Sequence, residues 1–167
     1  MRKPFYIFLV FIASSVGCSQ SGKIKRLIPA RPTGWVSDFE KNFTDEQVQF
    51  LDSMIRKHES ETANEIAVVT LALDTVSIQS EKEFDQFSLT LFNKWGIGKK
   101  EKNNGVGIIF SGKLRKLRIQ VGKGMESKLT NAEAKFIIDS LIIPEFKTSN
   151  YFQGILKGLQ AVMNEIE

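Results

Sequence analysis

The chain has 167 residues, of which 42% are hydrophobic and 25% are charged, a size and mix that suit one folded domain with appendages. The net charge of +4 is a mild bias, so the composition does not indicate a nucleic-acid-binding protein. A single cysteine and a single histidine exclude a disulfide framework, a thiolate zinc cluster and a multi-histidine metal site. Any bound metal would need mainly oxygen ligands, which favours Ca²⁺ or Mg²⁺.

Residues 1–17 have the form of a signal peptide. Arg2 and Lys3 precede an unbroken apolar run at residues 5–13, which is too short to span a membrane. Small residues follow, and then the only cysteine, Cys18, in an arrangement that resembles the bacterial lipobox. The resemblance implies that Cys18 is lipidated and anchors the protein at a membrane. The alternative is an ordinary cleaved secretion signal followed by an incidental cysteine.

The remaining chain divides into a tether and one domain. Residues 18–34 are rich in Ser, Gly, Lys and Arg, contain two prolines and show little periodicity, so we expect a tether there. Residues 35–167 are expected to form the folded domain. Loss of Arg2 and Lys3 with the signal peptide lowers the net charge from +4 to +2, which further weakens any case for nucleic-acid binding.

Four segments combine a helix-capping signal with apolar residues at helical spacing. In each, a Thr, Ser or Asn stands three residues before a Glu or Gln, the pattern of a capping box. The predicted helices begin at Thr44, Ser80, Thr130 and Asn150. The third is expected to end at Pro144. His58 falls late in the first helix, where we expect it to cap the helix or to be exposed, with a catalytic role as the alternative.

Three segments are predicted to be strands. Residues 65–73 and 106–110 are almost continuously apolar, which is typical of central strands covered on both faces. Residues 115–121 alternate apolar and polar side chains, and a glycine-containing turn predicts a hairpin with the preceding strand. The polar face of this strand carries Lys116 and Arg118, which we expect to be solvated and to protect a sheet edge. A phosphate-attracting surface is the alternative.

The resulting order, α-β-α-β-β-α-α, predicts an α/β fold: a single three-layer α/β/α sandwich with a small mixed sheet. Polar residues gather in the loops at the ends of the predicted strands, where ligands of open α/β sheets commonly bind.

Several of these loops carry recognisable motifs. They are residues 36–38 (VSD), 95–98 (WGIG), 103–106 (NNGV), 118–126 (RIQVGKGME), 129–131 (LTN) and 142–154 (IIPEFKTSNYFQG). In this order and spacing they resemble the TPM domain, a family of bacterial secreted and membrane-anchored proteins and of thylakoid-lumen proteins of the photosystem II repair system. The resemblance covers about residues 34–166 and implies an α/β/α sandwich.

The resemblance also implies a site at a loop edge of the sheet. Some members of the family bind Ca²⁺ or another divalent ion, and some are similar to weak acid phosphatases. Carried over by position, the residues of a Ca²⁺ or Mg²⁺ site would be Asp38, Asn103, Asn104 and Glu126, with Asn131 nearby. Asn replaces the usual Asp at residues 103, 131 and 150, which lowers the expected affinity for a cation and removes groups that could transfer a proton.

We therefore expect a membrane-anchored TPM-domain lipoprotein that acts as a weak divalent-cation binding and protein-interaction or assembly module. Its domain would be monomeric and would lie outside the cytoplasm in the bacterial cell envelope, facing the periplasm or the surface. Its partners would be the membrane, through Cys18, and an envelope membrane-protein complex. The alternative is a weak metal-assisted acid phosphatase that acts on phosphomonoesters with Asp38 as the catalytic residue.

Overall fold

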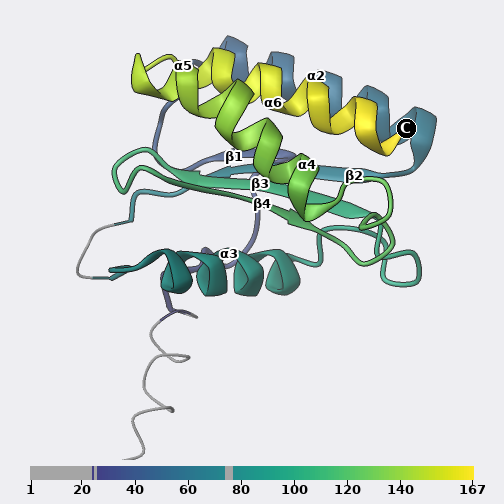
Figure 1. The fold of residues 1–167 in the computed structure, drawn as a ribbon, viewed down its shortest axis with the longest axis horizontal. Helices are drawn as coiled ribbons and strands as arrows, with labels where there is room; N and C mark the ends of the chain where they lie inside the picture. Colours follow the sequence, from purple (N-terminus) through teal and green to yellow (C-terminus); the bar gives the residue numbers. More distant parts are fainter. Residues whose placement is uncertain (1–23, 25, 74–76) are drawn as a thin grey trace, which may run out of the picture.

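The computed structural model describes residue 24 and residues 26–73 and 77–167. The expected signal peptide and, of the expected tether, residues 18–23 (which include Cys18) and residue 25 lie outside these residues. The described chain forms a four-stranded sheet from β1 (Val36–Asp38), β2 (Glu65–Thr70), β3 (Gly105–Ser111) and β4 (Lys116–Val121), in the order β1-β2-β3-β4 (Figure 1). The first three strands are parallel, and β4 is antiparallel to β3.

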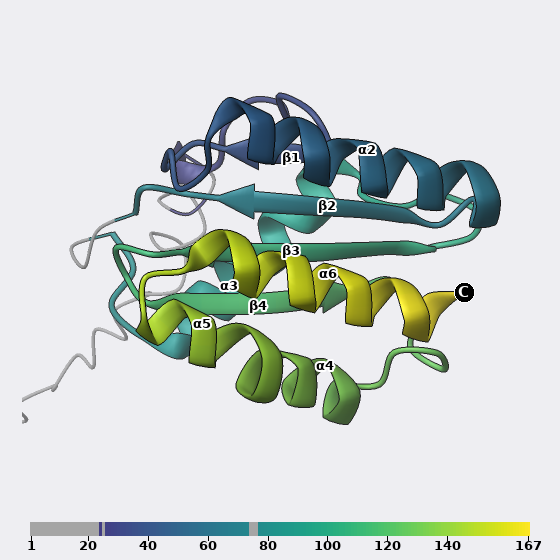
Figure 2. The ribbon, with the colours of Figure 1, turned by 90° about the horizontal axis from the view of Figure 1, so that it is seen from above.

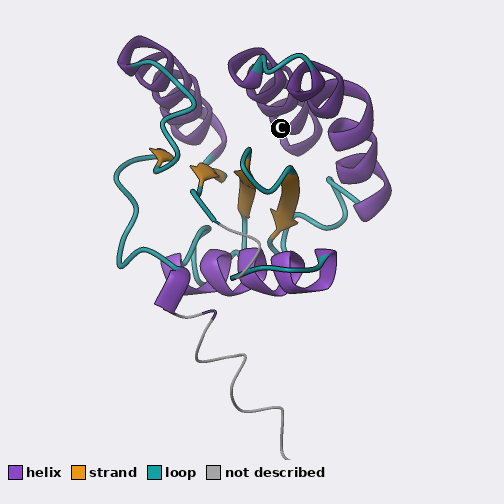
Figure 3. Cartoon of the chain, turned by 90° about the vertical axis from the view of Figure 1, so that its left-hand side faces the viewer, coloured by secondary structure: helices purple, strands orange, loops and turns teal. Residues whose placement is uncertain are grey.

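Helices cover both faces of the sheet. One face carries α2 (Asp45–Thr62), α4 (Asn131–Ile137), α5 (Ile143–Lys147) and α6 (Tyr151–Ile166), and the other carries α3 (Glu81–Trp95) (Figures 1 and 3). Successive strand residues point to opposite faces, so that Val68 joins the core beneath α2 and α6 while Val69 joins the core beside α3. The predicted three-layer α/β/α sandwich is thus confirmed.

Two neighbouring crossovers have opposite hands. The chain moves in one direction along the sheet from β1 through α2 to β2 and from β2 through α3 to β3, yet α2 and α3 lie on opposite faces (Figure 2). One of these two connections must therefore have the uncommon left-handed form. This feature depends on which face each helix covers, and helical periodicity alone does not predict it.

Three of the four predicted helix starts form complete capping boxes. At Thr44, Ser80 and Thr130 the side chain accepts a backbone hydrogen bond and the Glu or Gln three residues later returns one. Asn150 precedes α6 as predicted, but its side chain makes no capping hydrogen bond. Its amide instead donates to Glu145 Oε2 at 3.3 Å, so the predicted box at Asn150 is wrong although the helix boundary is right.

The third predicted helix does not end at Pro144. After α4 the chain passes through a π-helical turn, η1 (Ile138–Ile142), directly into α5, where the proline occupies the first turn. A proline is tolerated there because the first N–H groups of a helix have no intrahelical partner. Glycines let α6 approach this irregular segment: a Cβ at Gly158 would lie 2.5 Å from Ile142 Cδ1.

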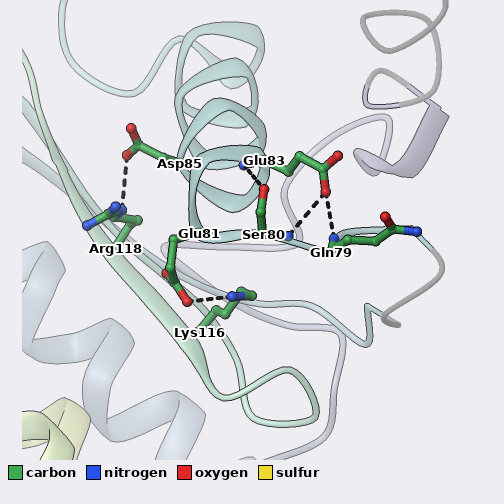
Figure 4. Close-up of polar contacts among 7 residues, drawn as sticks. All are labelled: Gln79, Ser80, Glu81, Glu83, Asp85, Lys116 and Arg118. Atoms are coloured by element: carbon green, nitrogen blue, oxygen red, sulfur yellow. Dashed lines mark hydrogen bonds and ion pairs between the residues drawn. The ribbon is translucent and has the colours of Figure 1, made fainter.

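The polar face of β4 packs against α3, contrary to the expectation that it is solvated. Lys116 pairs with Glu81, and Arg118 Nε lies 3.0 Å from Asp85 Oδ1 (Figure 4). The Lys116 side chain is only 14% exposed, since α3 covers it and supplies the opposite charge. These cations are therefore already paired and do not form an open phosphate-attracting surface.

No helix within the described ranges is both long enough and apolar enough to cross a membrane.

Candidate functional site

The predicted site residues lie at two opposite edges of the sheet. Asp38 ends β1 at the edge where β2 and β3 also end, which we call the carboxyl edge. Asn103 and Asn104 directly precede β3, and Glu126 follows β4, at the opposite or amino edge. The six residues of β2 separate the two edges by roughly 20 Å at about 3.3 Å per residue.

This arrangement corrects the expectation of one oxygen-lined site. Asn131 begins α4 after β4 has left the sheet at the amino edge, so it also lies away from Asp38. The structure does not bring the five residues together, and they do not fit a single coordinated ion. The pattern of motifs gave their order along the chain but not the edge at which each one emerges.

The carboxylate of Asp38 is occupied by hydrogen bonds from its own surroundings. Oδ1 accepts from the backbone N–H of Asn42 at 3.1 Å, and Oδ2 accepts from that of Phe43 at 2.8 Å. The hydroxyl of Thr70, at the end of β2, also donates to Oδ1. These bonds fold the loop that leads into α2, so Asp38 has a structural role in this edge.

Glu40 is a further organising residue of the carboxyl edge, and sequence reasoning missed it. Its carboxylate accepts from the backbone N–H groups of Gly112 at 2.7 Å and Lys113 at 2.9 Å. The loop after β1 is thereby tied to the turn between β3 and β4. No local signal predicts this contact, because its partners lie 72 and 73 residues away in the chain.

At the amino edge, Asn104 is buried and its side-chain amide is fully used. Its Oδ1 accepts from the backbone N–H of Lys99 at 3.0 Å. Its Nδ2 donates to the carbonyl of Ala63 at 2.6 Å and to Asn64 Oδ1 at 3.3 Å. Asn104 therefore joins the end of α2 to the loop before β3, and its oxygen is already engaged.

The glycines of the VGKG motif allow close backbone packing. Asn103 has a φ of 49°, and its carbonyl oxygen would lie 2.2 Å from a Cβ placed at Gly122. A Cβ at Gly124 would lie 2.0 Å from the carbonyl oxygen of Lys102. The motif thus brings two turns into direct contact, and Glu126 just beyond it is exposed to solvent.

The described ranges contain no group of three or more His, Cys, Asp or Glu side chains placed to hold one metal ion. At the carboxyl edge, the carboxylate oxygens of Asp38 and Glu40, two residues apart in one loop, accept hydrogen bonds from backbone N–H groups. A cation bound there would have to displace these donors.

His58 is buried, which corrects the expectation that it caps the helix or is exposed. Its side chain is 6% exposed, and Nε2 has no hydrogen-bond partner in the described structure. Burial lowers its pKa below the ordinary value, and the negative charges of Glu167 and Glu61 partly oppose this shift.

A hollow of about 390 Å³ lies beside the β3–β4 turn, and we call it the carboxyl-edge pocket. Its walls come from that turn, from the beginning of β4, from α5 and from the start of α6. The lining residues are Gly112, Arg115, Lys116, Leu117, Ile143, Phe146, Lys147, Ser149 and Tyr151. The rings of Phe146 and Tyr151 meet edge to face, with centroids 4.8 Å apart.

A second hollow, of about 440 Å³, lies between the segment before β1 and the end of α3. Its polar groups are largely satisfied within the protein. Trp35 Nε1 donates to Glu59 Oε2 at 2.7 Å, and the guanidinium of Arg56 lies 5.1 Å from the centroid of the Trp35 ring. Glu65 Oε2 accepts from the backbone N–H of Gly98 at 2.8 Å.

The comparison with protein families decides the classification, because the TPM domain profile matches residues 36–165. The chain belongs to the TPM domain family. A search of curated proteins finds no match.

Solved bacterial domains share the fold. The N-terminal domain of a P. gingivalis protein, solved by NMR, is 28% identical, with a TM-score of 0.67 over 80% of this chain and 82% of that one. The BA42 protein of Bizionia argentinensis is 21% identical, with a TM-score of 0.60 over 77% of this chain and 83% of that one. The N-terminal domain of cg2496 from Corynebacterium glutamicum is 14% identical, with a TM-score of 0.58 over 81% of each chain.

The last TPM motif meets the segment just before the central motif at the carboxyl-edge pocket. Phe146, Lys147 and Tyr151 come from the last motif, and Arg115 and Lys116 stand just before the central one. The pocket therefore joins parts of the sequence that are some 30 residues apart, whereas the WGIG, NNGV and VGKG motifs serve the packing of the amino edge. Chemically, the pocket combines cationic groups with an apolar floor, an arrangement that could bind a ligand with a negatively charged group and an apolar part.

Proposed function

We propose that this TPM-domain protein is a lipid-anchored binding module of the bacterial cell envelope, which contacts its partners through the loops at the carboxyl edge and performs no catalytic step. The anchor is supported by the apolar run at residues 5–13 and the position of Cys18 after it. The lack of a catalytic step is supported by the surroundings of Asp38.

The state of the Asp38 carboxylate carries this proposal. A phosphatase would need Asp38 as nucleophile, general base or metal ligand. The two oxygens of a carboxylate offer about four acceptor positions, and donors from the loop before α2 and from Thr70 occupy three of them. Release of Asp38 for chemistry would unfold the loop that it holds, so a structural role fits the geometry better.

Divalent-cation binding is less well supported than a binding role in general. It was expected from the family resemblance, but the residues that would share the ion lie at opposite edges. The hollow at the carboxyl edge is lined by Arg115 and Lys147, by Lys116, which pairs with Glu81, and by no acidic side chain. This composition favours a partner that carries negative charge.

The absence of catalysis is tested with an aryl phosphate and the purified chain from residue 18 onward carrying Cys18→Ser. We expect no hydrolysis, with or without Ca²⁺ or Mg²⁺, that depends on Asp38. Hydrolysis that is lost in Asp38→Asn, but kept in Glu126→Gln, would overturn the proposal, provided that both variants retain their near-UV circular dichroism. Glu126 is the matched control because it is an exposed carboxylate at the other edge.

The anchor is tested by fractionation of bacteria that express the full chain. The unaltered protein should be found in the membrane fraction, and its N-terminal peptide should carry acyl chains by mass spectrometry. Cys18→Ser should move the protein to the soluble fraction. An unaltered protein that is cleaved and soluble would show that the segment is an ordinary secretion signal.

A further inference from the structure

The carboxyl-edge pocket contains positive charge that the protein does not neutralise. Arg115 and Lys147 are exposed, and neither is a member of any ion pair within the described ranges. The third cation, Lys116, differs because it pairs with Glu81 of α3. Two cations from separate elements therefore face solvent at one hollow.

The acidic side chains near the pocket are already engaged. Glu40 accepts the backbone N–H groups of Gly112 and Lys113, and Glu145 pairs with Lys157 and accepts from Asn150. Neither acid pairs with Arg115 or Lys147. Glu40 keeps its negative charge, but Arg115 and Lys147 outnumber it, so a positive excess remains at the mouth of the pocket, available to a ligand.

The floor of the pocket is apolar and aromatic. Phe146 and Tyr151 meet edge to face, and Phe110 stacks beneath Tyr151 with centroids 6.1 Å apart. Leu117 of β4 adds aliphatic surface. The hydroxyl of Tyr151 has no hydrogen-bond partner within the described ranges and lies next to Gly112, where a Cβ would approach it to 3.1 Å.

Two lining residues hold unfavourable backbone conformations. Arg115 has a φ of 54° and Ser149 a φ of 61°, in the left-handed region that favours glycine or asparagine. Glycine would suit the turn before β4 better than arginine does. The structure therefore keeps a cationic side chain at a position where the backbone alone would select against it.

We propose that the carboxyl-edge pocket binds a carboxylate that is carried on an aromatic or aliphatic body. The planar guanidinium of Arg115 matches the two oxygens of a carboxylate, and Lys147 adds a second charge. The body lies on the Phe146 and Tyr151 rings. A volume of about 390 Å³ falls in the range of small-ligand sites.

This inference rests on the proposed binding role and names its ligand class. Two sources share the chemistry: a free aryl or alkyl carboxylic acid and the C-terminus of a polypeptide that ends in an apolar residue. Phenylacetate represents the free carboxylic acid, and N-acetylphenylalanine represents the polypeptide C-terminus. N-acetylphenylalaninamide lacks the charge, and acetate lacks the body.

The test is a titration of the ¹⁵N-labelled chain from residue 18 onward, carrying Cys18→Ser, which retains every described residue. N-acetylphenylalanine should shift the amides of Gly112, Lys113, Ser149 and Tyr151 with a dissociation constant on the order of 1 mM, typical for a ligand of this size. The amide and acetate should bind at least about tenfold more weakly. Whichever of N-acetylphenylalanine and phenylacetate binds more tightly identifies the source of the carboxylate. Tighter binding of either one supports the proposal.

Variants make the test specific. Arg115→Gln combined with Lys147→Gln should weaken binding about tenfold or more, which is the loss of one to two charge-assisted hydrogen bonds. Lys123→Gln, which removes an exposed cation at the amino edge, should leave binding unchanged. Arg115, Lys147 and Lys123 are all exposed, so the double variant and the control should both retain the fold.

Three results would overturn the proposal: no saturable shift at these amides, equal binding of the acid and its amide, or tighter binding of phenyl phosphate that depends on the same two cations. These failures are distinct from failure of the proposed function. A lipid-anchored, non-hydrolysing protein with a silent pocket would lose only this inference, whereas Asp38-dependent hydrolysis would remove the non-catalytic role.

Discussion

Asp38 and Glu40 stand two residues apart in one loop, and each holds that loop by accepting hydrogen bonds from backbone N–H groups. Asp38 fixes the path into α2, and Glu40 fixes the same loop against the β3–β4 turn. The family resemblance implied a ligand role for Asp38, but the hydrogen-bond partners of both carboxylates show a structural role. The carboxylates build the edge at which Arg115 and Lys147 then face solvent.

Replacement of Asp38 should reduce stability much more than replacement of Glu126. Asp38→Ala removes hydrogen bonds from Asn42, Phe43 and Thr70 and should lower the free energy of unfolding by about 2–4 kcal/mol. Glu126→Ala alters an exposed side chain and should change it by less than about 0.5 kcal/mol. Urea unfolding followed by circular dichroism measures both. Similar losses in the two variants would contradict the structural role of Asp38.

His58 should make stability depend on pH around neutrality. Its pKa is lowered in the folded protein, mainly by burial, so the unfolded chain binds the proton first as the pH falls. Protonation of the unfolded chain therefore draws the equilibrium toward unfolding. The urea midpoint should decrease as the pH falls from neutrality through the ordinary histidine range, and His58→Gln should remove most of this decrease.

The chain contains no other histidine, so few other groups titrate in this window. A midpoint that stays constant or rises on acidification from neutrality would show that His58 is not held in its neutral form by burial.

At the scale of helices and strands, local signals predicted the architecture well. The boxes at Thr44, Ser80 and Thr130 depend on residues three apart, and all three form as predicted. β1 was missed because three residues are too few to show a periodicity, and its pairing partner is 32 residues away. The path through Pro144 was also missed, because the π-helical turn depends on packing against α6.

The candidate site was less predictable than the fold. The motifs identify loops, but whether two loops share an edge depends on the direction of each strand and on the number of crossovers between them. Asn103 and Glu126 lie at the same edge because β4 is antiparallel to β3, whereas Asp38 is the last residue of the parallel strand β1 and lies at the other edge. Glu40 and Arg115 acquire their roles only from contacts between loops that are distant in sequence.

The packing of the two amino-edge turns can be tested with a pair of glycines. Gly122→Ala would place a Cβ 2.2 Å from the carbonyl oxygen of Asn103, an overlap that should cost about 3 kcal/mol or more of unfolding free energy. Gly96→Ala is the control: no atom lies within 4 Å of its Cβ, and only its φ of 67° is unfavourable, at about 1 kcal/mol. Chemical denaturation compares them, and an equal cost would show that the turns are not in close contact.

At the scale of the whole molecule, the described chain begins near the same end of the sheet as the β3–β4 turn (Figures 1 and 2). Ile24 and Ile28 belong to the core that also contains Leu71 and Leu73, which follow β2 at the carboxyl edge. Cys18 precedes Ile24 by six residues, a reach of about 20 Å at most. An anchor at Cys18 would therefore hold the carboxyl edge close to the membrane, within reach of membrane-bound partners.

The most direct test of a binding role at the carboxyl edge is to titrate one ¹⁵N-labelled sample with calcium chloride and a second, identical sample with N-acetylphenylalanine. We predict that the carboxylate shifts the amides of Gly112, Lys113, Ser149 and Tyr151, and that calcium produces no saturable response shared by the two edges. A single calcium-binding curve common to the amides around Asp38 and around Glu126, with the amides of the pocket unmoved by the carboxylate, would contradict it.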